Sequence, residues 1–201
     1  DHGEDRYRHH RGGAARLSDV LYQISAAEVR DLRVPPFQPQ ERVMQPPNLN
    51  PPLELVLERR LDAPRMAIWR CWTEPALMEQ WFCPKPWFVS DVRSDLRPGG
   101  AIAMVMNGPN GEQFPNQGVY LELEVGHRLV TTDAFTRAWQ PSAKAFMVAE
   151  ITLRDAPGGG TLYRAVARHW SEADRQQHEA MGFHEGWGKA TDQLEALART
   201  I

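Results

Sequence analysis

Apolar residues in the C-terminal segment, residues 171–201, recur at the spacing of an α-helix. At about 100° per residue, one half of the helical wheel collects the apolar and small side chains: Ala180, Phe183, Trp187, Ala190, Thr191, Leu194, Leu197, Ala198 and Ile201. Ser171 followed by Asp174 is similar to a capping box, so we expect the helix to begin at this serine. The pattern predicts one amphipathic helix, long for a globular domain, with a wide apolar face.

Three glycines, Gly182, Gly186 and Gly188, interrupt this helical pattern. Each is expected to lower helix stability by about 1 kcal/mol relative to alanine. Two interpretations follow. Either another backbone or a ligand approaches the helix closely at these positions, or burial of the helix compensates for the loss.

The preceding segment, residues 53–169, alternates between apolar and polar residues over short stretches, as half-buried strands do. The clearest stretch is residues 118–125, in which every second residue is Val or Leu. The pair Asn110-Gly111 favours positive φ and predicts a hairpin loop just before that stretch. The predicted strands are residues 53–61, 87–95, 101–107, 118–125, 128–135, 143–153 and 161–169.

Two short helices are expected after the first strand, over residues 65–73 and 74–81. Pro64 suits the first turn of one helix, and Pro84 with Pro86 ends the other. Strands joined by tight turns pair antiparallel, and helices kept to one side of such a sheet define the α+β class. We therefore predict a curved antiparallel sheet of about six or seven strands, wrapped around the long C-terminal helix.

Residues 1–52 differ from the rest and are expected to form an N-terminal extension ahead of a domain over residues 53–201. Residues 1–16 are charged and lack apolar periodicity, which is typical of disorder. Residues 17–34 predict one short helix, and the prolines that follow predict a polyproline-like linker. The extension is either dispensable, with a native start at Met44, or an arm that docks on the domain or on a neighbour.

The composition limits the classes of partner. Apolar residues make up 42% of the chain, enough for a core, and a formal charge of −3 gives no overall attraction to nucleic acid or to an anionic membrane. No apolar run approaches the roughly 18 residues of a membrane span, and no leader-like apolar segment is present, so we expect a cytoplasmic protein. Cys71 and Cys83 do not form a C-x-x-C pair and are expected to be reduced core thiols.

Two motifs in the sequence suggest a metal site and a phosphate site, but neither has the residue spacing that such a site requires. His178 and His184 are six residues apart, about 240° around a helix, so they cannot bind one metal together. The turn at residues 97–100 has two glycines, but it lacks Gly-Lys-Ser/Thr and precedes a strand. We expect no metal and no organic cofactor. Arg164 and Arg168 are predicted to form a solvated basic stripe on the outer face of the sheet.

Four segments together resemble a known superfamily. They are WRCWTEPALMEQWFCPK, DLRPGG, GVYLELEVGHRLVTTDAF and HEAMGFHEGWGKATDQLEAL, which begin at residues 69, 95, 118 and 178. In this order and spacing they resemble the START-like (SRPBCC) superfamily over about residues 53–201. More narrowly, they resemble the branch named for the activators of the heat-shock chaperone ATPase (Aha-type), with calicheamicin-resistance proteins (CalC-like) as neighbours. Residues 1–52 carry no such resemblance.

The resemblance implies a helix-grip fold (START/Bet v1-like), in which the sheet curls around the C-terminal helix and leaves a cavity between them. It does not imply one function, because the superfamily includes ligand carriers, cyclase-like enzymes, a self-sacrificing resistance protein and co-chaperone domains. No shared catalytic motif can be transferred to residues of this chain.

The expected cavity gives a set of candidate ligand-binding residues. Broad aromatic faces stack on planar ligands, and methionines adapt to variable contents. His169 and His184 are each expected at the inward side, where with Tyr163 they would orient a ligand carbonyl or hydroxyl. Ordinary core packing and structural histidines are the alternatives. The predicted residues are Trp72, Trp81, Phe82, Trp87, Met104, Met106, Leu121, Phe135, Met147, Tyr163, His169, Phe183, His184 and Trp187.

Three functions remain open. The first is binding of a small, largely apolar, aromatic or lipid-like molecule between the sheet and the C-terminal helix. The second is a co-chaperone-like interaction module, with a chaperone or a second copy of the chain as partner; an exposed patch beside a filled cavity would favour it. The third is a cyclase or lyase that uses His169, His184 or Tyr163 as acid or base. A roomy cavity with paired titratable groups would favour that enzyme, but we do not predict any catalytic residue.

Overall fold

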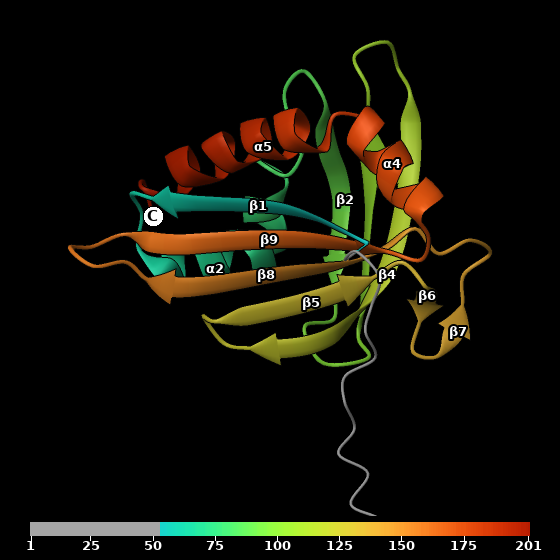
Figure 1. Ribbon diagram of the computed structural model, residues 1–201, viewed down its shortest axis with the longest axis horizontal. Helices are drawn as coiled ribbons and strands as arrows, with labels where there is room; N and C mark the ends of the chain where they lie inside the picture. The colour runs from blue at the N-terminus through green and yellow to red at the C-terminus, as the bar shows by residue number, and fades with distance from the viewer. Residues whose placement is uncertain (1–52) are drawn as a thin grey trace, which may run out of the picture. The chain divides into compact units, whose positions relative to one another are not determined.

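The computed structural model describes residues 53–201 (Figure 1). In this part of the chain one antiparallel sheet has the strand order β1-β9-β8-β5-β4-β3-β2. Its strands are β1 (Glu54–Leu61), β2 (Phe88–Ser94), β3 (Ala101–Asn107), β4 (Gln113–Glu124), β5 (Arg128–Thr132), β8 (Met147–Asp155) and β9 (Thr161–His169). The predicted α+β class, with an antiparallel sheet of about seven strands, is confirmed. The predicted extension and helix before residue 53 lie outside the described residues.

The segment between β5 and β8 differs from its prediction. The predicted strand over residues 128–135 ends at Thr132, and the strand predicted over residues 143–153 begins only at Met147. Between them β6 (Phe135–Arg137) and β7 (Gln140–Pro141) form a small separate hairpin. The Asp133 carboxylate accepts hydrogen bonds from the backbone N–H groups of Phe146 and Met147, at 2.9–3.1 Å. These hydrogen bonds join the two ends of the segment between β5 and β8, and they fix where β8 starts.

The turn at residues 97–100 is structural, as predicted. Gly99 has φ +78°, and its N–H donates to the Tyr120 carbonyl at 2.7 Å. A Cβ on Gly100 would lie 1.8 Å from the Asp95 carbonyl oxygen, so only glycine fits there. The turn therefore anchors the start of β3 against β4.

Two helices follow β1, as expected: α2 (Arg65–Thr73) and α3 (Pro75–Met78). The second helix is shorter than predicted. It ends at Met78, and the residues from there to Trp81 form turns. Pro75 has no N–H to donate to the Cys71 carbonyl four residues before it. The Trp81 Nε1 donates to that carbonyl instead, at 2.9 Å, and this bond ties the end of α3 to α2.

The C-terminal segment forms two helices, so the prediction of one continuous helix is wrong. Helix α4 (Glu172–Ala180) and helix α5 (Phe183–Ala198) are separated at Gly182, whose φ of +88° and ψ of 41° are left-handed. An α-helix cannot continue through that conformation. The predicted N-terminal cap is confirmed, since the Ser171 Oγ accepts a hydrogen bond from the Asp174 N–H at 3.1 Å.

Helices α2 and α5 pack on one face of the sheet, here called the inner face, which carries Leu57, Ile151 and Tyr163. Figure 1 shows α5 beside β1 and α2 behind β8 and β9. The core between these elements is continuous and largely apolar. Its buried members include Leu61, Ile68, Trp69, Cys71, Trp81, Tyr120, Leu129, Leu153, Ala165, Ala190, Leu194 and Ala198.

The opposite, outer face carries ion pairs rather than the solvated basic stripe that was predicted. The Glu150 side chain, only 6% exposed, accepts from Arg128 and from Arg168, at 2.6 Å each. Arg168 also binds Glu54, and Arg164 binds Glu58. Burial alone would raise the pKa of Glu150, but Arg168 and then Arg128 hold the pKa below its usual value. We call these residues, with Glu122 on Arg128, the outer-face ion network.

Both cysteines are free thiols and buried, as predicted. Burial raises the pKa of Cys71 and of Cys83 to about 11, so neither is a reactive thiolate near neutral pH. Within residues 53–201, no helix combines the length and the apolar character needed to cross a bilayer.

Candidate ligand site on the inner face

An aromatic cluster lies where α2 meets the turns after α3. Trp72 packs edge-on against Trp81, with ring centroids 4.8 Å apart, and against Phe82 at 5.9 Å. Trp81 is buried, whereas Trp72 and Phe82 are only partly buried. The cluster therefore presents part of its aromatic surface rather than enclosing all of it in the core.

Three polar side chains meet beside this cluster. The hydroxyl of the buried Tyr163, on β9, approaches the Trp72 indole and the Thr191 hydroxyl. Burial raises the pKa of Tyr163, and these two neighbours oppose the rise. Thr191 Oγ1 donates to the Trp187 carbonyl at 2.7 Å. The Trp72 Nε1 is buried and completes no hydrogen bond within residues 53–201.

A pair of buried histidines joins β9 to α4. His169 Nε2 and His178 Nδ1 are 2.9 Å apart, and His169 Nδ1 is 3.1 Å from the Leu53 carbonyl oxygen. A carbonyl only accepts, so the His169 Nδ1–H donates to Leu53, and one of the two facing nitrogens donates to the other across the His169–His178 contact. Burial, and secondarily the nearby His169, lower the pKa of His178 to about 4. His178 is therefore uncharged near pH 7, and its contact with His169 fixes α4 on the sheet.

His184 does not enter the site. The break at Gly182 rotates α5 relative to α4, and as a result His184 is exposed while His178 is buried. The prediction that His184 faces inward, based on one continuous helix, is wrong. His178 was considered only as a metal ligand, and Phe146, whose ring lies 5.1 Å from that of His178, was missed. The sequence signal for this arrangement is Gly182, because a glycine at that position predicts the end of a helix.

The other predicted residues divide by burial. Trp81, Met104, Tyr163, His169 and Phe183 are buried. Leu121 is partly buried on β4 beside a bulge, and Phe135 packs edge-on against Trp139 in the β6–β7 hairpin, apart from the aromatic cluster. We call the large apolar side chains that pack on the core yet keep some exposure the inner-face set: Leu57, Trp72, Leu77, Phe82, Trp87, Ile102, Met106, Leu123, Met147, Trp187 and Leu197.

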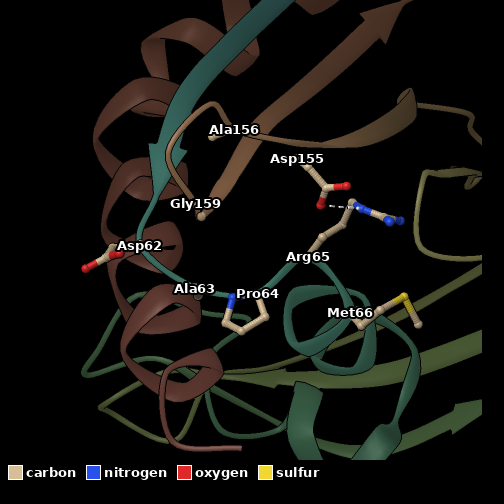
Figure 2. A pocket seen from close by; sticks show the side chains of 9 residues that line it. Asp62, Ala63, Pro64, Arg65, Met66, Asp155, Ala156 and Gly159 are labelled. Atoms are coloured by element: carbon tan, nitrogen blue, oxygen red, sulfur yellow. Dashed lines mark hydrogen bonds and ion pairs between the residues drawn. The ribbon is translucent and has the colours of Figure 1, made fainter.

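Two clefts lie elsewhere. The first, of about 610 Å³, lies between the start of α2 and the turn after β8. Figure 2 shows Arg65 and Asp155 pointing toward one another there, with an Arg65 Nε to Asp155 Oδ1 distance of 3.0 Å, while the Asp62 side chain points away. The second, of about 600 Å³, is on the outer face and is lined by Arg60, Arg154 and part of the outer-face ion network. Of the predicted ligand-binding residues, only Tyr163 borders either one.

No group of three or more His, Cys, Asp or Glu side chains in residues 53–201 is placed to hold a metal ion. The histidine pair uses both nitrogens of His169 in hydrogen bonds. Within the described chain, the inner face thus offers aromatic surface and polar anchors rather than a metal centre.

A curved antiparallel sheet packed on a C-terminal helix, with two short helices after the first strand, defines the helix-grip class of START-like α+β domains. Residues 62–199 match the family described as Activator of Hsp90 ATPase homolog 1-like protein, and the chain belongs to this family. The predicted superfamily and branch are therefore confirmed.

Solved structures agree with this assignment. A protein from Nitrosomonas europaea is 44% identical, with a TM-score of 0.72, over 76% of this chain and 97% of that one. A protein from Mycobacterium smegmatis is 27% identical, with a TM-score of 0.61, over 72% and 90%. An AHSA1-like protein from Aeromonas hydrophila, 18% identical over 73% and 92%, shares the fold with a TM-score of 0.55. No protein with a curated description matches the chain.

Proposed function

We propose that the domain binds a small, largely apolar molecule against the inner face, between the sheet and α5. The observation that carries this proposal is the inner-face set. Large aromatic and aliphatic side chains there keep contact with solvent although they border the core. Covering apolar surface stabilises a complex by about 25 cal/mol for each Å² removed from water.

The first test is native mass spectrometry of the purified full chain, followed by denaturation. Excess mass that is released on denaturation supports the proposal and gives the ligand's mass. The second test is titration with an apolar fluorescent probe, 1-anilinonaphthalene-8-sulfonate, whose emission rises on transfer from water to an apolar site.

A matched pair of variants locates the probe. Met106 is partly buried in the inner-face set, whereas Met66 is 45% exposed and borders the cleft at the start of α2. We expect Met106→Gln to weaken probe binding about fivefold, because it places an amide against the apolar ligand. Met66→Gln should leave the affinity for the probe within twofold of the wild-type value. The opposite pattern would move the site to the cleft of Figure 2 and refute the proposal.

A second candidate function is a chaperone-interaction module that uses the outer face. The observation in its favour is the outer cleft, where Arg154 and Arg60 border Leu162, an apolar side chain that is 43% exposed. Under this hypothesis the chain raises the ATPase rate of an Hsp90-class chaperone, and Arg154→Glu reduces that effect. Stimulation that survives the charge reversal would exclude this surface.

A further inference from the structure

The outer cleft, of about 600 Å³, is lined by more arginines than carboxylates. Three of its five arginines are already in ion pairs: Arg59 with Asp192, Arg128 with Glu150, and Arg164 with Glu58. The other two, Arg60 and Arg154, have no carboxylate partner within residues 53–201. The cleft therefore contains two guanidinium charges that the described chain does not neutralise.

Strand register brings these two arginines to one place. Leu162 of β9 lies directly opposite Arg60 of β1 on one side and directly opposite Arg154 of β8 on the other. The three strands are neighbours in the sheet (Figure 1), so the two arginine backbones are two strand spacings, about 10 Å, apart. Residues directly opposite one another project from the same face of a sheet, so both long side chains can reach one group held above Leu162.

The carboxylates on neighbouring positions of these strands are engaged elsewhere. Asp155 of β8 pairs with Arg65 at 3.0 Å, and Glu58 of β1 pairs with Arg164 at 2.9 Å. Neither is available to the unpaired arginine on its own strand. A negative group for these two arginines must therefore come from outside the described domain.

The number of charges and donors defines that group. Arg60 uses Nη2 on the Gly159 carbonyl, at 2.6 Å, which leaves the donors of its other nitrogens for a ligand. Guanidinium groups bind phosphate oxygens through pairs of parallel N–H donors. A phosphate monoester has three acceptor oxygens and a charge of about −2 near neutral pH, so it matches two guanidinium groups. A carboxylate, with two oxygens and one charge, matches only one.

The apolar side chain between the two arginines indicates what the phosphate is attached to. Leu162 is 43% exposed in a cleft whose lining is largely charged. Covering it removes apolar surface from water, which favours a ligand with an apolar part beside its charged group.

We infer that the outer cleft binds a small organic phosphate monoester, with its phosphate between Arg60 and Arg154 and its apolar part against Leu162. This site lies on the opposite face of the sheet from the proposed inner-face site and does not depend on it.

Two probes of one shape test the inference on the full chain by isothermal titration calorimetry: 1-naphthyl phosphate, a dianion at about pH 7.5, and 1-naphthyl sulfate, a monoanion. The wild type should bind the phosphate about tenfold more tightly, because only the phosphate carries a charge for each arginine. Arg60→Gln and Arg154→Gln should each weaken binding of 1-naphthyl phosphate about tenfold, the effect of losing a hydrogen bond to a charged group. Arg93→Gln removes the same charge from an exposed arginine of β2, at the opposite edge of the sheet, and should leave the affinity within twofold.

A second measurement does not depend on any variant. Lowering the pH to about 5 adds a proton to the phosphate and not to the sulfate, so the wild-type affinity for the phosphate should fall toward that for the sulfate. Equal affinities for the two esters at about pH 7.5, or binding that survives both Arg60→Gln and Arg154→Gln, would overturn the inference.

The failure of this inference is distinguishable from failure of the proposed function. Binding of both esters that is weakened by Met106→Gln and not by the arginine variants would place the naphthyl ring on the inner face. That result would overturn the phosphate site and support the proposed function. If neither ester binds the wild type, the phosphate site is overturned, and the inner-face site is still tested by its own fluorescent probe.

Discussion

At the scale of single residues, the two adjacent tryptophans Trp72 and Trp81 occupy similar positions but differ in hydrogen bonding. Trp81 supplies the donor that Pro75 cannot give to the Cys71 carbonyl. Trp72 brings a donor that the described chain does not use. The two indoles therefore differ in how their N–H groups are used, although their rings pack against each other in one aromatic cluster.

Removing each donor should therefore have different effects on stability. Trp81→Phe leaves the Cys71 carbonyl unpartnered and should lower the free energy of unfolding by about 1–3 kcal/mol. Trp72→Phe removes a donor that completes no hydrogen bond within residues 53–201, so we expect a change of less than about 1 kcal/mol. Urea denaturation of both variants checks this. Equal losses would mean that the Trp72 N–H has a partner in the folded protein.

The buried His178 makes stability depend on pH. The folded-state pKa of His178 is lowered from 6.5 to about 4. Below pH 6.5 the unfolded chain takes up a proton that the folded chain does not, so stability falls as the pH decreases from about 6.5 to 4. The loss from this group should be on the order of 2 kcal/mol, allowing for partial solvation.

Denaturation midpoints at several pH values, measured on two variants, test this assignment. His178→Gln removes the titrating group and should flatten the slope between pH 6.5 and 4. His184→Gln changes an exposed histidine and should keep the wild-type slope. If His178→Gln keeps that slope as well, another group is responsible.

At the scale of elements, the helix break at Gly182 decides which side chains reach the inner face. Its backbone is left-handed, and nothing lies within 4 Å of an added Cβ, so strain is the only obstacle to a larger residue. Gly186, within α5, also has open space but lies in the body of the helix and has no positive φ. The two glycines thus have opposite roles although they stand four residues apart.

Alanine at each position should separate these roles. Gly182→Ala should destabilise the protein by about 1–2 kcal/mol, because it forces an L-residue into the left-handed region. Gly186→Ala should stabilise it by about 0.5–1 kcal/mol through helix propensity. Thermal unfolding followed by circular dichroism measures both. A stabilising Gly182→Ala would indicate that α4 and α5 join as one helix.

At the scale of the whole molecule, the outer-face ion network links β1, β9, β8, β5 and β4 across most of the sheet. Glu150 is its buried centre, and Glu58 is a peripheral member with a side chain that is 68% exposed. A buried carboxylate between two partly buried guanidinium groups contributes more than an exposed pair, because removing it takes the shared partner from both cations.

Glu150→Gln should lower the free energy of unfolding by about 2 kcal/mol. The loss is smaller than for an isolated buried ion pair, because Arg128 still pairs with Glu122 and Arg168 still pairs with Glu54. Glu58→Gln should change it by less than about 1 kcal/mol. Measurement at pH 8 keeps His178 uncharged. If the two variants lose the same stability, the network does not depend on its buried centre.

Sequence patterns predicted most of the elements, because strand alternation and turn chemistry act over a few residues. Residues 118–125 alternate, and they lie within β4 and the turn after it. The Ser171 cap and the turn at residues 97–100 were predicted for the same reason. The site was predicted less well: Trp72, Phe82 and Trp187 lie on the inner face, but His184 is exposed. Its inward position depended on assuming that the helix continued through Gly182.

The sequence alone determined the class of the fold and its resemblance to the Aha-type branch, since both depend on local periodicity and motif order. Only the tertiary structure decided that His178 pairs with His169, that Glu150 joins two arginines, and that the Trp72 N–H completes no hydrogen bond among the described residues. These features require residues from distant segments to meet. Their positions depend on a left-handed glycine and on strand register, which the spacing of apolar residues does not encode.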